Sequence, residues 1–221
     1  GPRGDPGPPA VGSRAPGHRW LSGQVAERPG RRRWLLRLVG VVALVAVSER
    51  TTAGGLAGEW LQLAGLACMA SAALGRIWTS VFIAGFKDVQ LVRGGPYAVL
   101  RHPLYALSLL AVLGIGLTSR SASIALMLLA SFTAIYVSAA RAEDRFLLAG
   151  HGADFARYAS QVRAFLPRWS AYEVPDSLEV RPRILWKAFL DAGSLLGLWM
   201  LLVAADGLQR AGLTPTWITL P

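Results

Sequence analysis

The sequence has few of the side chains from which metal centres and disulfide frameworks are built. Its 221 residues include one cysteine, Cys68, and only three histidines. A single cysteine cannot form a disulfide within the chain, and one cysteine with scattered histidines lacks the spacing of a metal-ligand cluster. We therefore expect neither an internal disulfide nor a bound metal.

The motifs of the commonest nucleotide-binding and hydrolytic folds are also missing. No G-x-G-x-x-G loop, Walker-type P-loop or G-x-S-x-G nucleophile elbow occurs in the chain. Any small-molecule site must therefore be built from other residues.

Charged residues are scarce as well, and long apolar runs take their place. Asp, Glu, Lys and Arg make up 16% of the chain, against about 25% in ordinary soluble domains, and the mean hydropathy is +0.40. Five runs approach the roughly 20 apolar residues that cross a bilayer as a helix, although the first and third need flanking residues to do so. We predict an all-α, polytopic integral membrane protein with five spans, four being the alternative count: 34–47, 56–74, 104–118, 122–140 and 188–205.

The net charge of +10 is unevenly distributed between the segments that flank these runs. With five spans and a cytoplasmic N-terminus, the outer segments hold only Arg50, Arg120 and Arg210 of the 23 lysines and arginines. This asymmetry follows the positive-inside rule, and no aromatic-plus-basic motif of a nucleic-acid binder accompanies it. We expect a multi-pass protein of the bacterial inner membrane, partnered by the lipid bilayer, that binds no nucleic acid.

The chain divides into a tail and one membrane domain. Residues 1–30 contain seven glycines and six prolines and little that could pack, which predicts a disordered tail. Residues 31–221 form the membrane domain. Between positions 155 and 165, four apolar residues recur at helical spacing. We expect an amphipathic cytoplasmic helix there, ending at Pro167.

Polar residues in a non-random pattern lie in two segments, 88–105 and 141–167. In the five-span topology both segments face the cytoplasm and can meet. Pro103 suits the first turn of a helix, so the third span should begin there, with Arg101 and His102 at its N-terminus. Free N–H groups at such a terminus favour electron-rich ligands. The convergence of the two segments indicates a site.

Simpler structural explanations exist for the same residues. Arg101 and His102 can act only as interfacial anchors, and the acidic pair at 143–144 can be solvated beside neighbouring arginines. Asp191, in the fifth span, can snorkel or pair with another span, for example with Arg37.

Two sequence blocks stand in these segments. The first is "QLV" at 90–92, then Gly95, Pro96 and Tyr97, then "RHPLY" at 101–105. The second is an acidic pair, spaced aromatics and a Val-x-x-Phe-x-Pro ending, which stand at Glu143, Asp144, Gly152, Phe155, Tyr158, Val162, Phe165 and Pro167. In order and separation the two blocks resemble the isoprenylcysteine carboxyl methyltransferase and phospholipid methyltransferase superfamily over about residues 88–167.

The resemblance implies an integral membrane methyltransferase that uses S-adenosylmethionine, bound in a cytoplasmic pocket, and a small lipophilic or lipid-like acceptor. The cofactor contacts that it carries over are Gln90, Leu91, Val92, Tyr97, His102, Pro103, Leu104, Tyr105 and Glu143. The candidates for catalysis are His102, Arg101 and Glu143, and those for acceptor binding are Arg141 and Tyr158.

The sequence departs from the family pattern at two positions. Leu107 replaces a glycine two residues after the motif tyrosine, which is expected to narrow the approach to the pocket. Ala139 stands where the isoprenylcysteine enzymes have an acceptor-binding arginine, so a prenylated cysteine is not implied as acceptor. An NADPH-dependent reductase of the sterol-reductase type and a non-enzymatic membrane protein that docks a partner are the alternatives.

Overall fold

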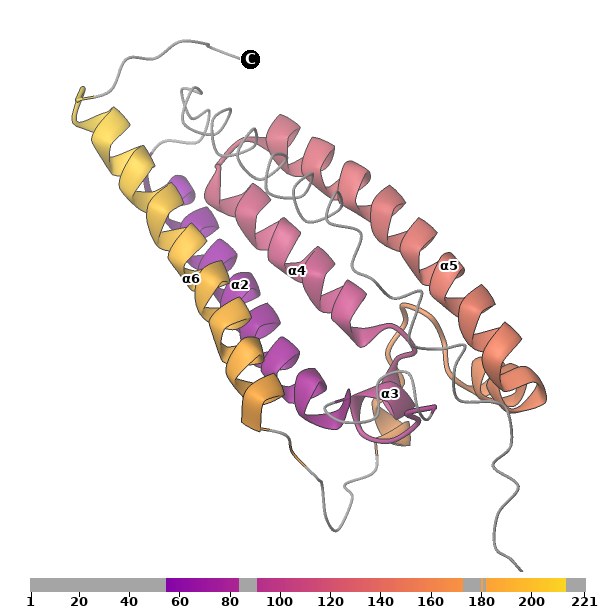
Figure 1. The fold of residues 1–221 in the computed structure, drawn as a ribbon. Coiled ribbons are helices and arrows are strands. Elements are labelled where there is room, and N and C mark those ends of the chain that lie inside the picture. The colour runs from indigo at the N-terminus through magenta and orange to yellow at the C-terminus, as the bar shows by residue number, and fades with distance from the viewer. Residues whose placement is uncertain (1–54, 84–90, 173–179, 181, 214–221) are drawn as a thin grey trace, which may run out of the picture. The chain divides into compact units, whose positions relative to one another are not determined.

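Every regular element in the described part of the chain is helical. The computed structural model describes residues 55–83, 91–172, 180 and 182–213. Its elements are α2 (Gly55–Ile83), α3 (Pro96–Val99), α4 (Pro103–Thr118), α5 (Ala122–Gln161), the 3-10 helix η1 (Trp169–Ala171) and α6 (Pro182–Arg210) (Figure 1). The predicted all-α class is confirmed.

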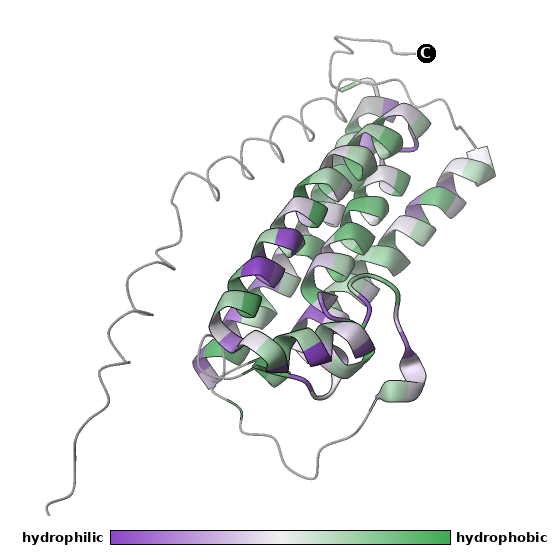
Figure 2. Ribbon diagram, turned by 90° about the vertical axis from the view of Figure 1, so that its right-hand side faces the viewer, coloured by the Kyte–Doolittle hydropathy of each residue, from purple (hydrophilic) through white to green (hydrophobic). Residues whose placement is uncertain are grey.

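The long helices have the length and composition of membrane spans. Helices α2, α5 and α6 are long and apolar enough to cross a bilayer, and α4 is a shorter apolar helix. Hydrophobic residues predominate along these helices (Figure 2). Leu56 and Trp60 on α2 and Leu201 on α6 are 69–76% exposed, as suits helices that face hydrocarbon rather than water. The described residues therefore form a polytopic membrane protein.

Four of the five predicted spans correspond to these helices. The predictions 56–74, 104–118, 122–140 and 188–205 fall within α2, α4, α5 and α6 respectively. The predicted first span at 34–47, like the predicted tail, lies outside the described residues.

The ends of α4 follow from local sequence. Pro103 occupies the first turn, as predicted, and His102 is the N-cap residue. At the other end a short turn at 119–121 connects α4 to α5, and the Ser121 hydroxyl accepts a hydrogen bond from the Ile124 N–H at 3.4 Å. This bond satisfies one of the N–H groups that a helix start leaves without a partner. The sequence "SRS" at 119–121 thus forms a tight hairpin between the two helices.

Small residues let α4 pack closely against α2. Helix α4 contacts α2, α5 and α6, and α2 also contacts α6 (Figure 1). A Cβ at Gly65 would lie 2.7 Å from the carbonyl oxygen of Gly114, and a Cβ at Gly114 would lie 2.8 Å from the carbonyl oxygen of Gly65. Membrane helices commonly use such residues to bring backbones together. The two backbones touch here, so neither glycine can carry a side chain.

Leu107, where the chain departs from the family pattern, faces the same interface. Its Cδ2 lies 2.5 Å from the position that a Cβ at Gly75 would occupy. The leucine on α4 thus fills a notch that a glycine leaves on α2. Its bulk is accommodated between the two helices.

A polar triad also joins these helices. Arg76 of α2 donates from Nε to Oδ2 of Asp191 on α6 at 2.8 Å and makes a second contact to the same oxygen through Nη2. Its Nη1 donates to the Ser108 hydroxyl on α4 at 2.7 Å. The expected pairing of Asp191 with another span is confirmed, and its partner here is Arg76, because α6 packs against α2. Arg37, the example considered from the sequence, lies outside the described residues.

Helix α5 combines the predicted span with the predicted amphipathic helix. It extends from Ala122 to Gln161, and a kink at Gly152, whose backbone has φ 50° and ψ −124°, divides it into two helices, of which the second contains Phe155 and Tyr158. Residues 141–151 contain no proline and many good helix formers, so the span continues into the polar segment. The helix also ends at Gln161 rather than at Pro167, because Val162 is already extended.

Candidate functional site

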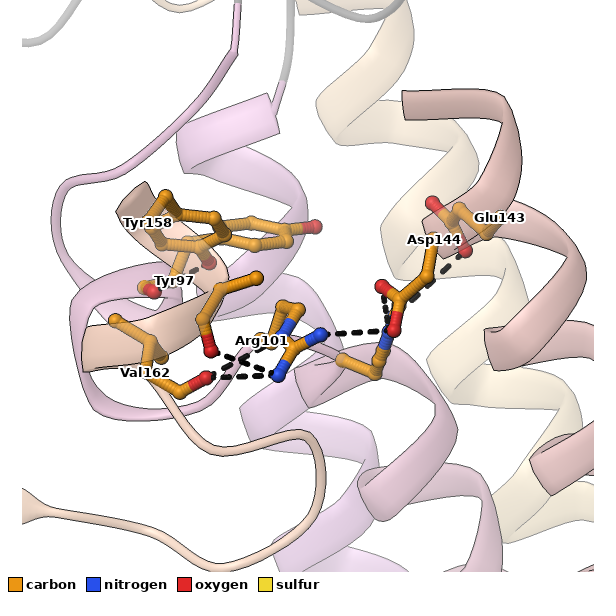
Figure 3. Close-up of polar contacts among 8 residues, drawn as sticks. Tyr97, Arg101, Glu143, Asp144, Tyr158 and Val162 are labelled. Carbon is orange, nitrogen blue, oxygen red and sulfur yellow. Dashed lines mark hydrogen bonds and ion pairs between the residues drawn. The ribbon is translucent and has the colours of Figure 1, made fainter. Parts of the chain in front are cut away.

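Arg101, just before α4, ties two parts of α5 together. Its Nη1 lies 2.8 Å from Oδ2 of Asp144. Its Nε and Nη2 donate to the Val162 carbonyl at 3.2 and 3.1 Å, and Nη2 also donates to the Ala159 carbonyl at 3.1 Å (Figure 3). Carbonyls in the last turn of a helix lack intrahelical partners and attract cations. Arg101 therefore caps the C-terminus of α5 and pairs with a carboxylate that precedes its kink.

Backbone bonds extend this attachment past the end of α5. The Arg101 N–H donates to the Arg163 carbonyl at 2.9 Å, and the His102 N–H donates to the Ala164 carbonyl at 3.3 Å. Further on, the Arg168 N–H donates to the Val99 carbonyl at 3.0 Å. The segment after α5 thus runs alongside the segment that leads into α4, which is the juxtaposition expected from the topology.

His102 is buried, with a relative exposure of 4%. Its Nε2 lies 2.9 Å from Oδ1 of Asp144, and because a carboxylate only accepts, this nitrogen must carry the hydrogen. Its Nδ1 lies 3.8 Å from Oε2 of Glu143. The ring centroid is 5.7 Å from that of Tyr105 and 6.0 Å from that of Phe165. His102 is therefore fixed on one edge by Asp144 and has Glu143 near the other.

Four tyrosines belong to the same cluster, and Tyr105 is the one in contact with His102. Tyr105 stacks on Tyr136 of α5 at a centroid distance of 5.6 Å. The Tyr158 hydroxyl donates to the carbonyl of Tyr97 at 2.7 Å, so it holds α5 against α3. Burial raises the pKa of the Tyr97 hydroxyl above its ordinary value, and the Glu143 carboxylate adds to the rise. Tyr97 therefore keeps its proton well into the alkaline range.

Most of the predicted site residues meet in this cluster, but some do not. Pro103 and Leu104 form the first turn of α4 beside His102, and Leu91 and Val92 are half-buried in an irregular segment. Gln90 lies outside the described residues. Arg141 is exposed on α5, and none of the described contacts joins it to the cluster.

Sequence reasoning underrated Asp144 and missed Tyr136. Asp144 binds both Arg101 and His102, whereas the family pattern had drawn attention to Glu143. Tyr136, Ala140 and Asp144 are spaced four residues apart on α5, so they share one helix face. That spacing is a signal that the sequence does contain. Ala139, where the related enzymes have arginine, is buried.

The cluster leaves Glu143 as the carboxylate most open to a ligand. Its side chain is 45% exposed, against 26% for Asp144 and 3% for His102. An open carboxylate beside aromatic rings and a buried imidazole can bind a polar or cationic small molecule. Within the described ranges, no group of three or more His, Cys, Asp or Glu side chains could hold a metal ion.

The fold and the cluster together define a class: a polytopic all-α membrane protein with a polar, aromatic-lined site where α4 begins. The sequence profile of the phospholipid methyltransferase family matches residues 56–153, which include α2, α4 and α5 as far as its kink. The chain belongs to this family, within the isoprenylcysteine carboxyl methyltransferase and phospholipid methyltransferase superfamily.

Two bacterial proteins are similar to the chain over most of its length. The cobalt-zinc-cadmium resistance protein CzcN of Cupriavidus metallidurans is 31% identical over 187 residues, which cover 85% of this chain and 86% of that protein. The nickel-cobalt-cadmium resistance protein NccN of Alcaligenes xylosoxydans xylosoxydans is 29% identical over 185 residues, which cover 82% of this chain and 86% of that protein. No solved structure matches the chain significantly.

Proposed function

We propose that the protein is a membrane methyltransferase that uses S-adenosylmethionine, bound at the cytoplasmic face, to methylate a small lipophilic or lipid-like acceptor. The observation that carries the proposal is the placement of Glu143. Its half-exposed carboxylate lies beside the buried His102, and aromatic residues of α3, α4 and α5 surround the pair. Membership of a methyltransferase family supports the same conclusion.

The residues present suit the chemical groups of this cofactor. S-adenosylmethionine supplies an electrophilic methyl group on a cationic sulfonium. Leu104 and the ring of Tyr105, which are half-buried, offer apolar and aromatic surface for an adenine and a sulfonium, whereas Tyr97 and Pro103 are buried. Glu143 can accept hydrogen bonds from ribose hydroxyls or from the ammonium group. The carried-over residues 90–92 would add to the same wall.

The charged groups around His102 hold the site rather than react in it. Arg101 is committed to Asp144 and to carbonyls of Ala159 and Val162, so it acts as a positioning residue. Asp144 fixes the tautomer and direction of the His102 ring. Methyl transfer requires an in-line approach of acceptor to donor, and precise positioning can supply much of the rate. Holding α5 against α4 is therefore part of the proposed catalytic role.

The same commitment of Arg101 disfavours the reductase alternative. NADPH carries several phosphate groups, which proteins bind chiefly through arginine and lysine. Arg101 already donates to a carboxylate and two carbonyls, and Arg93 is an exposed residue paired with Asp154. A cofactor with one carboxylate and one ammonium fits the acidic, aromatic surroundings of Glu143 better.

Calorimetric titration of the purified protein in detergent tests the proposal. We expect S-adenosylmethionine to bind and NADPH not to bind. Glu143→Gln should weaken cofactor binding at least tenfold, which is about 1.4 kcal/mol, without lowering the melting temperature. Asp154→Asn is the matched control, because it alters an exposed carboxylate on the same helix outside the cluster and should bind normally. If the folded protein does not bind S-adenosylmethionine, the proposal is wrong.

The names of the two relatives suggest a physiological setting. Both are called metal resistance proteins, so we propose that methylation by this protein contributes to metal tolerance of its host. Deleting the gene should lower the tolerated concentration of cobalt, zinc or cadmium, and the Glu143→Gln gene should fail to restore it. Full restoration by a variant that cannot bind the cofactor would contradict this role.

A further inference from the structure

The turn that joins α4 to α5 directs an arginine into the protein. Arg120 has φ 57° and is the only residue other than glycine with a positive φ in the described ranges. A left-handed backbone costs a side-chain-bearing residue about 1–2 kcal/mol, and such strain persists where the surroundings enforce it. The Arg120 side chain is 3% exposed. The turn therefore buries a guanidinium that an ordinary loop would leave in water.

Two helices, α2 and α6, contribute to the polar group that surrounds this arginine. Arg120 Nη2 lies 3.5 Å from Oδ2 of Asp206 on α6. Asp206 accepts a hydrogen bond from Gln62 Nε2 of α2 at 2.7 Å and pairs with Arg210 at 2.8 Å. Two guanidinium groups thus converge on one carboxylate, at the opposite end of α4 from the Arg101 cluster.

A cavity of about 500 Å³ opens beside Arg120. Its walls are apolar and come from three helices, through Leu61 of α2, Leu117 of α4, and Ala125 and Leu126 of α5. Its polar end is formed by Arg120 and Ser121. The volume lies within the range of ligand sites, roughly 300–1,000 Å³. A site with one cationic end and long apolar walls suits an amphiphile with an anionic head.

The position of the cavity in the membrane favours a lipid as that amphiphile. Helix α4 has 16 residues, so it is about 24 Å long, whereas the hydrocarbon core is about 30 Å thick. The turn at 119–121 therefore lies at the inner edge of the headgroup layer, and the bilayer around it must be locally thinner. The start of α5, with its N–H groups and dipole, adds a further preference for an anion there.

We propose that an anionic phospholipid binds in this cavity, with its phosphate between Arg120 and the first turn of α5 and an acyl chain along Leu61, Ala125 and Leu126. The site lies at the end of the bundle away from the proposed cofactor site. Its occupant braces the α4–α5 hairpin against Leu61 of α2. The inference does not depend on methyl transfer.

Native mass spectrometry of the purified full-length protein with added lipid tests the proposal. We expect phosphatidylglycerol to remain bound at activation energies that strip phosphatidylcholine, and to raise the melting temperature of the detergent-solubilised protein. Arg120→Gln should reduce the bound phosphatidylglycerol at least fivefold. Arg210→Gln, which removes the more exposed arginine on the same aspartate, should retain it. Equal retention of both lipids would overturn the proposal.

A second variant keeps the test decisive if Arg120→Gln fails to fold. Ala122, an exposed residue in the first turn of α5, also lines the cavity. Ala122→Trp should fill the space without changing any charge, and it should abolish phosphatidylglycerol retention and the thermal shift. Unchanged lipid binding in this variant would refute the assignment of the cavity. Displacement of the lipid by equimolar oleate would show a site for fatty acids instead of phospholipids.

Discussion

The two ends of α4 carry the same chemical pair in different surroundings. At its start, Arg101 pairs with Asp144 of α5, and at its end, Arg120 pairs with Asp206 of α6. At the start, the two oxygens of Asp144 are taken by adjacent residues of one segment, Arg101 and His102. At the end, one oxygen of Asp206 is shared between α2, the α4–α5 turn and α6.

The difference indicates two roles for similar ion pairs. The first pair orients an arginine and a histidine and leaves the neighbouring Glu143 half-exposed, ready for a ligand. The pair of Arg120 and Asp206 joins the α4–α5 turn to α2 and α6, and both of its charged side chains are largely buried. What separates the two ends is the open carboxylate and the ring of tyrosines at one of them.

Of the substitutions that test this difference between the two ends of α4, removing Arg101 should have the largest effect. Arg101→Gln deletes the ion pair with Asp144 and the hydrogen bonds to Ala159 and Val162. Removing one partner of a largely buried pair costs about 3 kcal/mol or more, and the segment after Gly152 should detach. We expect a lower melting temperature, loss of cofactor binding and faster proteolysis within residues 153–168.

Arg93→Gln is the control for that experiment. Arg93 also contacts the part of α5 after the kink, but its pair with Asp154 is 3.6 Å long and exposed, so the change should cost less than about 1 kcal/mol. If Arg101→Gln lowers the melting temperature no more than Arg93→Gln does, then Arg101 is only an interfacial anchor and does not hold the two parts of α5 together.

A smaller and more selective effect is expected at the other end. Asp206→Asn weakens the acceptor shared by Gln62, Arg120 and Arg210. Hydrogen bonds to charged groups contribute about 1.5–3 kcal/mol, so resistance to unfolding by SDS should fall by about 2 kcal/mol. Affinity for S-adenosylmethionine should stay within twofold of the wild-type value. A tenfold loss of affinity would mean that the two ends are coupled through α4.

Much of this arrangement was predictable from local sequence. Pro103 fixed the start of α4, and hydropathy located the four long apolar helices that the structure describes. The meeting of the Arg101 segment with the acidic pair followed from placing both on one side of the membrane. Each of these inferences depends on one segment at a time, or on which side of the bilayer it lies.

What the sequence did not reveal depends on how each helix is rotated against its neighbours. Hydropathy cannot tell whether Asp191 faces Arg37 or Arg76, because apolar residues predominate on all sides of these helices. It cannot show that Leu107 packs on Gly75, or that Asp144 rather than Glu143 turns toward Arg101. The helical continuation of the span from residue 141 to the kink at Gly152 was not predictable, because the polar residues of 141–151 resemble the end of a span.

The smallest effect is expected from the hydrogen bond between two uncharged groups near Arg101. Tyr158→Phe removes the hydrogen bond from its hydroxyl to the Tyr97 carbonyl, which is buried. An ordinary hydrogen bond contributes about 1 kcal/mol, so the melting temperature should fall slightly and proteolysis after Gly152 should rise less than in Arg101→Gln. Tyr172→Phe is the control, since Tyr172 is half-buried and contacts the ring of Trp78, which phenylalanine retains. Tyr158→Phe could instead release the part of α5 after Gly152 as fully as Arg101→Gln does. In that case the neutral hydrogen bond, and not the ion pair, holds this part of α5 in place. The two ends of α4 would then differ in hydrogen bonding rather than in charge.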